Sequence, residues 1–222
     1  MTGLLDSWVR AITELSPTAD PAQARRDGEG LLLRWNEGHR SYHTAQHLNE
    51  VLSALNLLGG ADRPAERALA TLAAWLHDAV YDVTAEAGAS ERASATLATA
   101  VLTGLGCRED IATAVEQLIL MTTTHQSRSA DPVGDALHDA DLWILAAPMP
   151  RFRQYCEQVR TEYRHVPDPA YAEARTGILC ALVDRADVYR TARAREEWTA
   201  AARSNVASEL RSLSTLLPDR AR

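Results

Sequence analysis

Residues 69–82 read Leu-Ala-Thr-Leu-Ala-Ala-Trp-Leu-His-Asp-Ala-Val-Tyr-Asp. Apolar residues in this stretch recur at intervals of three and four, at Leu69, Leu72, Leu76 and Val80. That spacing places them on one face of an α-helix, and Pro64 upstream suits the first turn of the same helix. The pair His77-Asp78 follows the apolar run directly. An imidazole beside a carboxylate suits a divalent cation of intermediate hardness, although the same pair also occurs at ordinary polar helix edges.

The rest of the chain is also predicted to be helical. Good helix formers dominate the composition, and no alternation of apolar and polar residues persists long enough for a strand. Asp20-Pro21 is an N-cap followed by proline at the first helical position, and Gly59-Gly60 is a helix end. Further helices are expected over residues 43–58, 88–104, 109–122, 150–164, 169–183 and 195–214. The predicted fold class is therefore all-α.

The 222 residues suffice for one large domain or two small ones. Prolines near residues 148–150 mark a weak boundary, but helical apolar stripes continue on both sides of it. We therefore predict a single helical domain over residues 1–222. Its residues 184–222 are expected to form a C-terminal helical segment packed on the core.

The chain carries 30 acidic and 23 basic residues, a net charge of −7. This balance disfavours a nucleic acid duplex or an anionic membrane as partner, because neutralising phosphates requires a basic face. No stretch approaches the roughly 18 apolar residues of a membrane span. The first residues lack a signal-peptide pattern, so a cytoplasmic location is expected. The three cysteines are far apart and form no Cys-x-x-Cys pair, which disfavours a disulfide framework or a thiolate zinc site.

Two of the seven histidines, His43 and His47, are four residues apart. On a helix over residues 43–58 they point to the same side, which continues into the apolar residues Val51 and Leu55. Imidazoles on an inward face require polar partners or a metal ion, because unpaired burial is costly. The pair indicates a site, while a single such histidine would be more typical of a satisfied core residue.

A third polar element is Asp139-Ala140-Asp141, which leads into the apolar residues Leu142, Ile144 and Leu145. Buried carboxylates are rarely left without a partner, so this element is a candidate for the same site. Asp139 can also be the N-cap of a helix that follows it. Two residues apart on a helix differ by about 200°, so both acids cannot point inward there. We expect Asp141 to face inward and Asp139 to cap a helix or face solvent.

The order His47, His77-Asp78, Asp141 resembles the signature of the HD superfamily of metal-dependent phosphohydrolases, and in particular a bacterial branch of predicted hydrolases of about this length. Five blocks carry the resemblance: residues 42–47, 75–82, 90–95, 139–142 and 160–163. Ser90 stands where that branch has asparagine. The match covers about residues 31–183, which we take as the core of the domain. The family implies an all-α fold with a metal site buried among the helices.

Carried over by residue, the resemblance implies His47, His77, Asp78 and Asp141 as ligands of a divalent metal ion. Asp141 fits the last block better than Asp139 because it stands between a small residue and leucine, and Asp187 is a weaker competitor. Mg, Mn, Fe, Co, Ni and Zn all remain open, as does the number of ions. Two neutral imidazoles and two carboxylates would balance the charge of one such ion.

The resemblance also suggests residues for catalysis and support. His43 and Asp78 are expected to act in catalysis, with His43 either protonating the leaving oxygen or only orienting a ligand. His125 is a candidate for a second metal or for a phosphate contact, whereas His138 is expected to pack beside the ligand segment. Glu91 and Glu162 are candidates for bases in outer positions of the site, or are surface acids that cap helices. Arg160 either holds a phosphate or pairs with Glu162 or a nearby helix acid.

The function implied is hydrolysis of a small phosphate ester, a nucleotide being the first choice, by metal-activated water. Phosphomonoesterase and phosphodiesterase activity both remain open. One alternative is a di-iron oxidoreductase of the same superfamily, which would need a histidine such as His125. Another is a non-catalytic, metal-containing domain that senses a ligand. The expected partner is a small phosphorylated substrate, and a homodimer is compatible with the sequence.

Overall fold

The computed structural model describes residues 2–59, 63–125, 131–184 and 187–217. Within these ranges every regular element is a helix and no strand occurs, which confirms the all-α prediction. The chain divides into two compact units, Met1–Asp141 and Leu142–Arg222. The boundary lies a few residues before the one expected near 148–150. The single domain over 1–222, with its core at 31–183 and its segment 184–222, stays a prediction.

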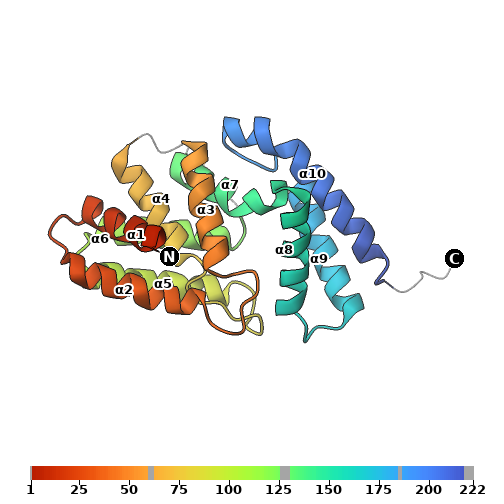
Figure 1. The fold of residues 1–222 in the computed structure, drawn as a ribbon, viewed down its shortest axis with the longest axis horizontal. Coiled ribbons are helices and arrows are strands. Elements are labelled where there is room, and N and C mark those ends of the chain that lie inside the picture. Colours follow the sequence, from red (N-terminus) through yellow and green to blue (C-terminus); the bar gives the residue numbers. More distant parts are fainter. Residues whose placement is uncertain (1, 60–62, 126–130, 185–186, 218–222) are drawn as a thin grey trace. The chain divides into compact units, whose positions relative to one another are not determined.

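The first unit contains the helices labelled α1 to α7 in Figure 1 and is built around α4. Its helices are α1 (Thr2–Leu15), α2 (Pro21–Trp35), α3 (Ala45–Leu58), α4 (Pro64–Leu76), α5 (Ala89–Gly104), α6 (Glu109–Thr122) and α7 (Pro132–Asp141). Helix α4 contacts α1, α3, α5, α6 and α7. Residues 72–76 at its C-terminal end are completely buried, as their apolar composition predicts. The His77-Asp78 pair is therefore delivered to the middle of this unit.

Local signals in the sequence explain where several helices begin and end. The Asp20 carboxylate accepts a hydrogen bond from the Ala22 N–H at 2.9 Å and begins α2. Gly59 ends α3 in the left-handed conformation, with φ of 61°. The prediction that the third helix includes His43 is wrong. The Thr44 hydroxyl accepts a hydrogen bond from the Gln46 N–H at 3.3 Å, so α3 begins after this cap.

Helix α7 is a second correction, because Asp139 does not begin a helix. The Asp131 carboxylate accepts a hydrogen bond from the Gly134 N–H at 2.9 Å near the start of α7. The helix ends at Asp141, so Asp139 lies in its last turn. A short helix of ten residues that contains glycine and three acids carries too few apolar positions for the periodicity to reveal it.

The described residues of the second unit form the helices η1 (Leu142–Ala146), α8 (Met149–Glu162), α9 (Asp168–Val183) and α10 (Ala192–Ser214). Helix α10 contacts η1, α8 and α9. Buried Asn205 of α10 donates hydrogen bonds to the carbonyls of Leu145 and Ala147 at 2.8 and 2.9 Å, which fixes the chain after η1. The three long helices lie where the sequence predicted them, with ends shifted by at most three residues.

No helix in the described ranges is both long enough and apolar enough to cross a membrane.

A glycine allows α1 and α2 to pack closely. Trp8 of α1 is completely buried, and its indole N–H donates a hydrogen bond to the Ala24 carbonyl of α2 at 2.8 Å. A Cβ atom at Gly28 would lie 2.6 Å from Cδ1 of Trp8 and 2.7 Å from Cδ1 of Leu5. At Gly30, in the same helix, a Cβ atom would meet no described atom within 4 Å.

We therefore expect Gly28→Ala and Gly30→Ala to have opposite effects on the free energy of unfolding. Gly28→Ala should lower it by about 1–3 kcal/mol, because the added methyl group overpacks the interface. Gly30→Ala should raise it by up to about 1 kcal/mol, because alanine restricts the unfolded chain and favours helix. Urea denaturation of the full chain measures both. Equal stability of the two variants would contradict the close packing of α1 on α2.

Candidate metal centre

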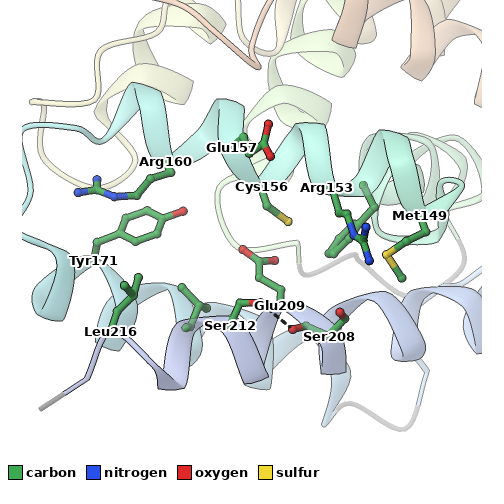
Figure 2. A pocket seen from close by; sticks show the side chains of 12 residues that line it. Met149, Arg153, Cys156, Glu157, Arg160, Tyr171, Ser208, Glu209, Ser212 and Leu216 are labelled. Carbon is green, nitrogen blue, oxygen red and sulfur yellow. Dashed lines mark hydrogen bonds between the residues drawn. The ribbon is translucent and has the colours of Figure 1, made fainter.

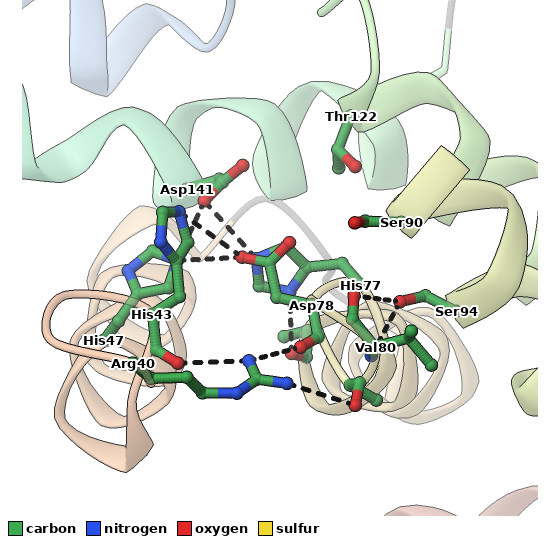
Figure 3. Close-up of polar contacts among 12 residues, drawn as sticks. Arg40, His43, His47, His77, Asp78, Val80, Ser90, Ser94, Thr122 and Asp141 are labelled. Carbon is green, nitrogen blue, oxygen red and sulfur yellow. Dashed lines mark hydrogen bonds and ion pairs between the residues drawn. The ribbon is translucent and has the colours of Figure 1, made fainter. Parts of the chain in front are cut away.

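Three separate segments of the first unit bring imidazoles and carboxylates together (Figure 3). His47 lies in the first turn of α3, His77 caps the C-terminal end of α4, and Asp78 follows it. Asp141 is the last residue of α7. The side chains of His47 and His77 are 3% and 1% exposed, so the group lies in the interior.

The distances among these side chains are short. Oδ1 of Asp141 lies 3.2 Å from Nε2 of His47 and 3.5 Å from Nε2 of His77. Oδ2 of Asp78 lies 3.1 Å from Nε2 of His77 and 3.8 Å from Nε2 of His47. The candidate ligand atoms of His47, His77 and Asp78 all lie within 4.8 Å of one another. This buried group could hold a metal ion, and the Asp141 carboxylate lies beside it.

The ring of His77 is oriented for such a role. Its Nδ1 lies 2.9 Å from the Ala74 carbonyl, which can only accept, so Nδ1 carries a proton. In the neutral ring Nε2 then has a free lone pair. Among the described residues, this buried Nε2 has no hydrogen-bond partner, although two carboxylates face it. A buried nitrogen left in that state fits a cation between the imidazole and the carboxylates.

Trp35 supports both imidazoles from behind. Its ring centroid lies 6.2 Å from that of His47 and 5.6 Å from that of His77. The indole is completely buried, and its N–H donates a hydrogen bond to the Trp75 carbonyl at 3.0 Å. Both imidazoles therefore pack on one indole that is hydrogen-bonded to the backbone of α4.

The charges of the site shift the pKa values of its members. Burial alone would lower the pKa of His77, but the carboxylates of Asp78 and Asp141 raise it well above its ordinary value of 6.5. Burial would raise the pKa of both acids, yet the facing histidines lower it well below the usual value. In the absence of a metal ion, these charges favour the ionised form of both carboxylates and the protonated form of His77.

His43 lies at the edge of this group, in the turn before α3. Its Nε2 is 4.0 Å from Oδ2 of Asp78, and its side chain is 20% exposed. Its ring stacks on that of Tyr81 with centroids 4.1 Å apart and meets the edge of Tyr42 at 4.8 Å. From the sequence, a helix was expected to place His43 on the same side as His47. The turn before α3 brings it there instead.

His125 lies near the Asp141 oxygen that does not face His47 and His77. Its Nε2 lies 3.9 Å from Oδ2 of Asp141, and its Nδ1 lies 3.2 Å from Nδ1 of the buried His138. Its backbone has φ of 50°, which is uncommon for a residue with a side chain.

The prediction that Asp139 caps a helix or faces solvent is wrong. Asp139 is completely buried, with Oδ1 3.8 Å from Nε2 of His138.

The residues around Glu91 hold the loop that follows Asp78. The Ser94 hydroxyl accepts a hydrogen bond from the Val80 N–H at 3.0 Å and lies 3.1 Å from the Val80 carbonyl, to which it donates. The Ser90 hydroxyl accepts a hydrogen bond from the Asp82 N–H at 3.1 Å. Glu91 itself is half-buried in the first turn of α5. The sequence singled out Glu91 in this segment, but the hydroxyls of Ser90 and Ser94 make the hydrogen bonds to the loop.

Arg160 and Glu162, with Asp187, belong to the second unit. The Arg160 guanidinium pairs with Asp168 at 2.7 Å and donates to the carbonyls of Tyr163 and Val166. It also lines a cavity of about 690 Å³ walled mainly by α8 and α10 (Figure 2). Glu162 is buried and Asp187 is exposed. These contacts give Arg160 a role at the end of α8, and its support of the metal site stays a prediction.

Arg40 is a residue of the site that the sequence did not reveal. Its side chain is completely buried, and it donates to the carbonyls of His43 and Asp78. The one available signal was its place two residues before Tyr42-His43, ahead of the helix expected over residues 43–58. Backbone carbonyls as acceptors leave no pattern in a sequence, so the contact could not be foreseen.

Comparison of the chain with models of protein families, with curated proteins and with solved structures finds no match.

We expect binding of a divalent ion to release about one proton near neutral pH, because the ion replaces the proton on Nε2 of His77. The affinity should fall as the pH falls, since the raised pKa keeps His77 protonated. In the metal-free protein, the same proton stabilises the fold at low pH, and this contribution is lost as the pH rises through the raised pKa. Titration calorimetry with Co(II) in buffers of different ionisation enthalpy measures the proton release.

The control for this experiment is His165→Ala, which removes an exposed histidine of the second unit. It should bind Co(II) as the wild type does, whereas His77→Ala and Asp78→Ala should each lose the ion. Full metal occupancy in Asp78→Ala would contradict the assignment of the buried group.

Proposed function

We propose that this protein is a metal-dependent phosphohydrolase of the HD superfamily that acts on a small phosphate ester, a nucleotide in the first instance. The observation that carries the proposal is the meeting of His47, His77 and Asp78 in the interior, with ligand atoms within 4.8 Å of one another. These three residues, with Asp141, are those that the motif blocks of the sequence single out. The proposed ligands are these four side chains.

A divalent ion in such a site supplies a water of lowered pKa and a positive charge that stabilises phosphoryl oxygens. The donor set of two imidazoles and two carboxylates suits Mn, Fe, Co, Ni or Zn and also admits Mg. The carboxylates of Asp78 and Asp141 suit a cation, because the facing histidines lower their pKa and favour the ionised form. Their two negative charges balance one divalent ion and leave the site neutral toward an anionic substrate.

His43 is the proposed general acid. Its Nε2 lies 4.0 Å from Oδ2 of Asp78, so it stands beside the ligands and is partly open to solvent. A proton on this nitrogen can be given to the leaving oxygen of a substrate bound at the centre. The ring of Tyr81 stacks on the His43 imidazole, with ring centroids 4.1 Å apart, and supports its orientation.

A di-iron oxidoreductase is the second candidate, and the position of His125 favours it. Nε2 of His125 lies 3.9 Å from Oδ2 of Asp141, and these two side chains would help to hold a second ion. In the hydrolase, the same nitrogen would instead contact a phosphoryl oxygen. The number and kind of ions distinguish the two functions.

We expect the purified protein, loaded with Mn(II) or Mg(II), to hydrolyse at least one compound in a panel of nucleotides, cyclic nucleotides and sugar phosphates. Phosphate release and nucleotide chromatography measure monoesterase and diesterase activity. Two tightly held iron ions, with no turnover of the panel, would instead support the oxidoreductase.

We expect His43→Ala to keep its metal affinity but to lower kcat by roughly 10²–10⁴-fold, because the general acid is removed. The loss should be smaller for a nitrophenyl ester, since nitrophenolate leaves without a proton. Steady-state kinetics on both substrates, with metal analysis, test this. An equal loss on the two substrates would assign His43 a purely positional role, and loss of the metal would make it a ligand.

A further inference from the structure

Arg40 is a buried cation in the loop between α2 and α3, and all its donors are used. The side chain is completely buried. Nε and Nη2 donate to Oε2 of Glu37, both at 3.2 Å. Nη1 donates to the carbonyls of His43 and Asp78 at 3.1 and 2.7 Å, and Nη2 donates to that of Ala79 at 3.3 Å. A guanidinium has five N–H donors, and these are five hydrogen bonds.

The three carbonyls belong to the two segments that carry the candidate centre (Figure 3). The His43 carbonyl lies in the turn that leads into α3 and His47. The carbonyls of Asp78 and Ala79 lie just past the end of α4, where no further helical turn can satisfy them. One guanidinium therefore joins the backbone of His43 to the backbone of the residues that follow His77.

Aromatic rings on the guanidinium extend this connection to the imidazoles. The carbon Cζ of Arg40 lies 5.6 Å from the centroid of Trp35 and 5.5 Å from that of Tyr81. Trp35 packs on the rings of His47 and His77, and Tyr81 stacks on the ring of His43. The same cation thus contacts the backbone of both segments and the rings that support their histidines.

We propose that Arg40 is a positioning residue that sets the separation of the His43–His47 segment from the His77–Asp78 segment, and with it the geometry of the metal ligands. This inference rests on the proposed function, because it requires that the group binds metal. Lysine cannot replace the arginine, since an ammonium has three donors on a flexible stem and no planar fork for three carbonyls and a carboxylate. A residue that acts only on folding would alter stability and leave bound metal unchanged.

The test is Arg40→Lys in the full chain, with Co(II) as the probe. Cobalt affinity is measured by competition with a chelator, and ligand geometry by the visible absorption spectrum of the bound ion. We expect affinity to fall roughly 10–100-fold, as is typical when an outer contact of a metal site is removed, and the spectrum to change in shape. Thermal unfolding of the metal-free protein is recorded in parallel.

Arg175→Lys is the matched control. Arg175 is a largely buried arginine, 11% exposed, with a carboxylate and an aromatic partner, Glu209 at 3.0 Å and Tyr155, and both partners belong to the second unit. This variant should lose stability without any change in cobalt affinity or spectrum. The same pattern in Arg40→Lys, lower stability with unchanged cobalt binding, would overturn the proposal.

A second variant covers the case in which Arg40→Lys does not fold. Glu37→Gln keeps the guanidinium and its three carbonyl contacts but replaces the carboxylate that orients the fork. We expect weaker cobalt binding in this variant also, and unchanged affinity and spectrum would overturn the proposal. If the wild-type protein binds no cobalt, the proposed function itself fails, which is a different outcome from cobalt binding that is insensitive to Arg40.

Discussion

The contact of the His77 imidazole with two carboxylates, in the interior of the first unit, is the constraint on which the rest of the site depends. Nε2 of His77 lies 3.1 Å from Asp78 and 3.5 Å from Asp141, and all three side chains are largely buried. Buried carboxylates are costly unless they face positive charge or donors. Asp78 and Asp141 can therefore be buried here only if the histidines, a bound cation or both compensate their charge.

The sequence predicted the parts of this arrangement that depend on regular patterns. Helix α4 and its terminal His77-Asp78 follow from a strong apolar period, and α2 follows from its aspartate cap and proline. Helix α7 was missed because Gly134 and three acids obscure its short pattern. The position of His43 was predicted for the wrong reason, since the cap at Thr44 excludes it from α3 while the turn keeps it beside Asp78.

The supporting contacts were not predictable because they use backbone atoms of irregular segments. Arg40 binds three carbonyls, and Ser94 binds both polar atoms of the Val80 backbone. A sequence shows that an arginine or serine is present but not which carbonyl or amide remains unsatisfied past a helix end. The burial of Asp139 has a similar cause. It depends on how the last turn of α7 lies in the unit, and two residues of one turn can both be buried when neighbours cover more than one face.

The negative charges of Asp78 and Asp141 can be compensated in two ways. In the metal-free protein, the carboxylates raise the pKa of His77, so a proton on its imidazole offsets part of their negative charge. A divalent ion would displace that proton and balance both carboxylates. Small zinc domains are unfolded without metal because metal binding supplies their free energy of folding. Here the helices around α4 bury an apolar core of their own, and the facing histidines favour the ionised form of the carboxylates. The first unit should therefore be folded before the ion arrives, and the ion should bind to a site that is already assembled.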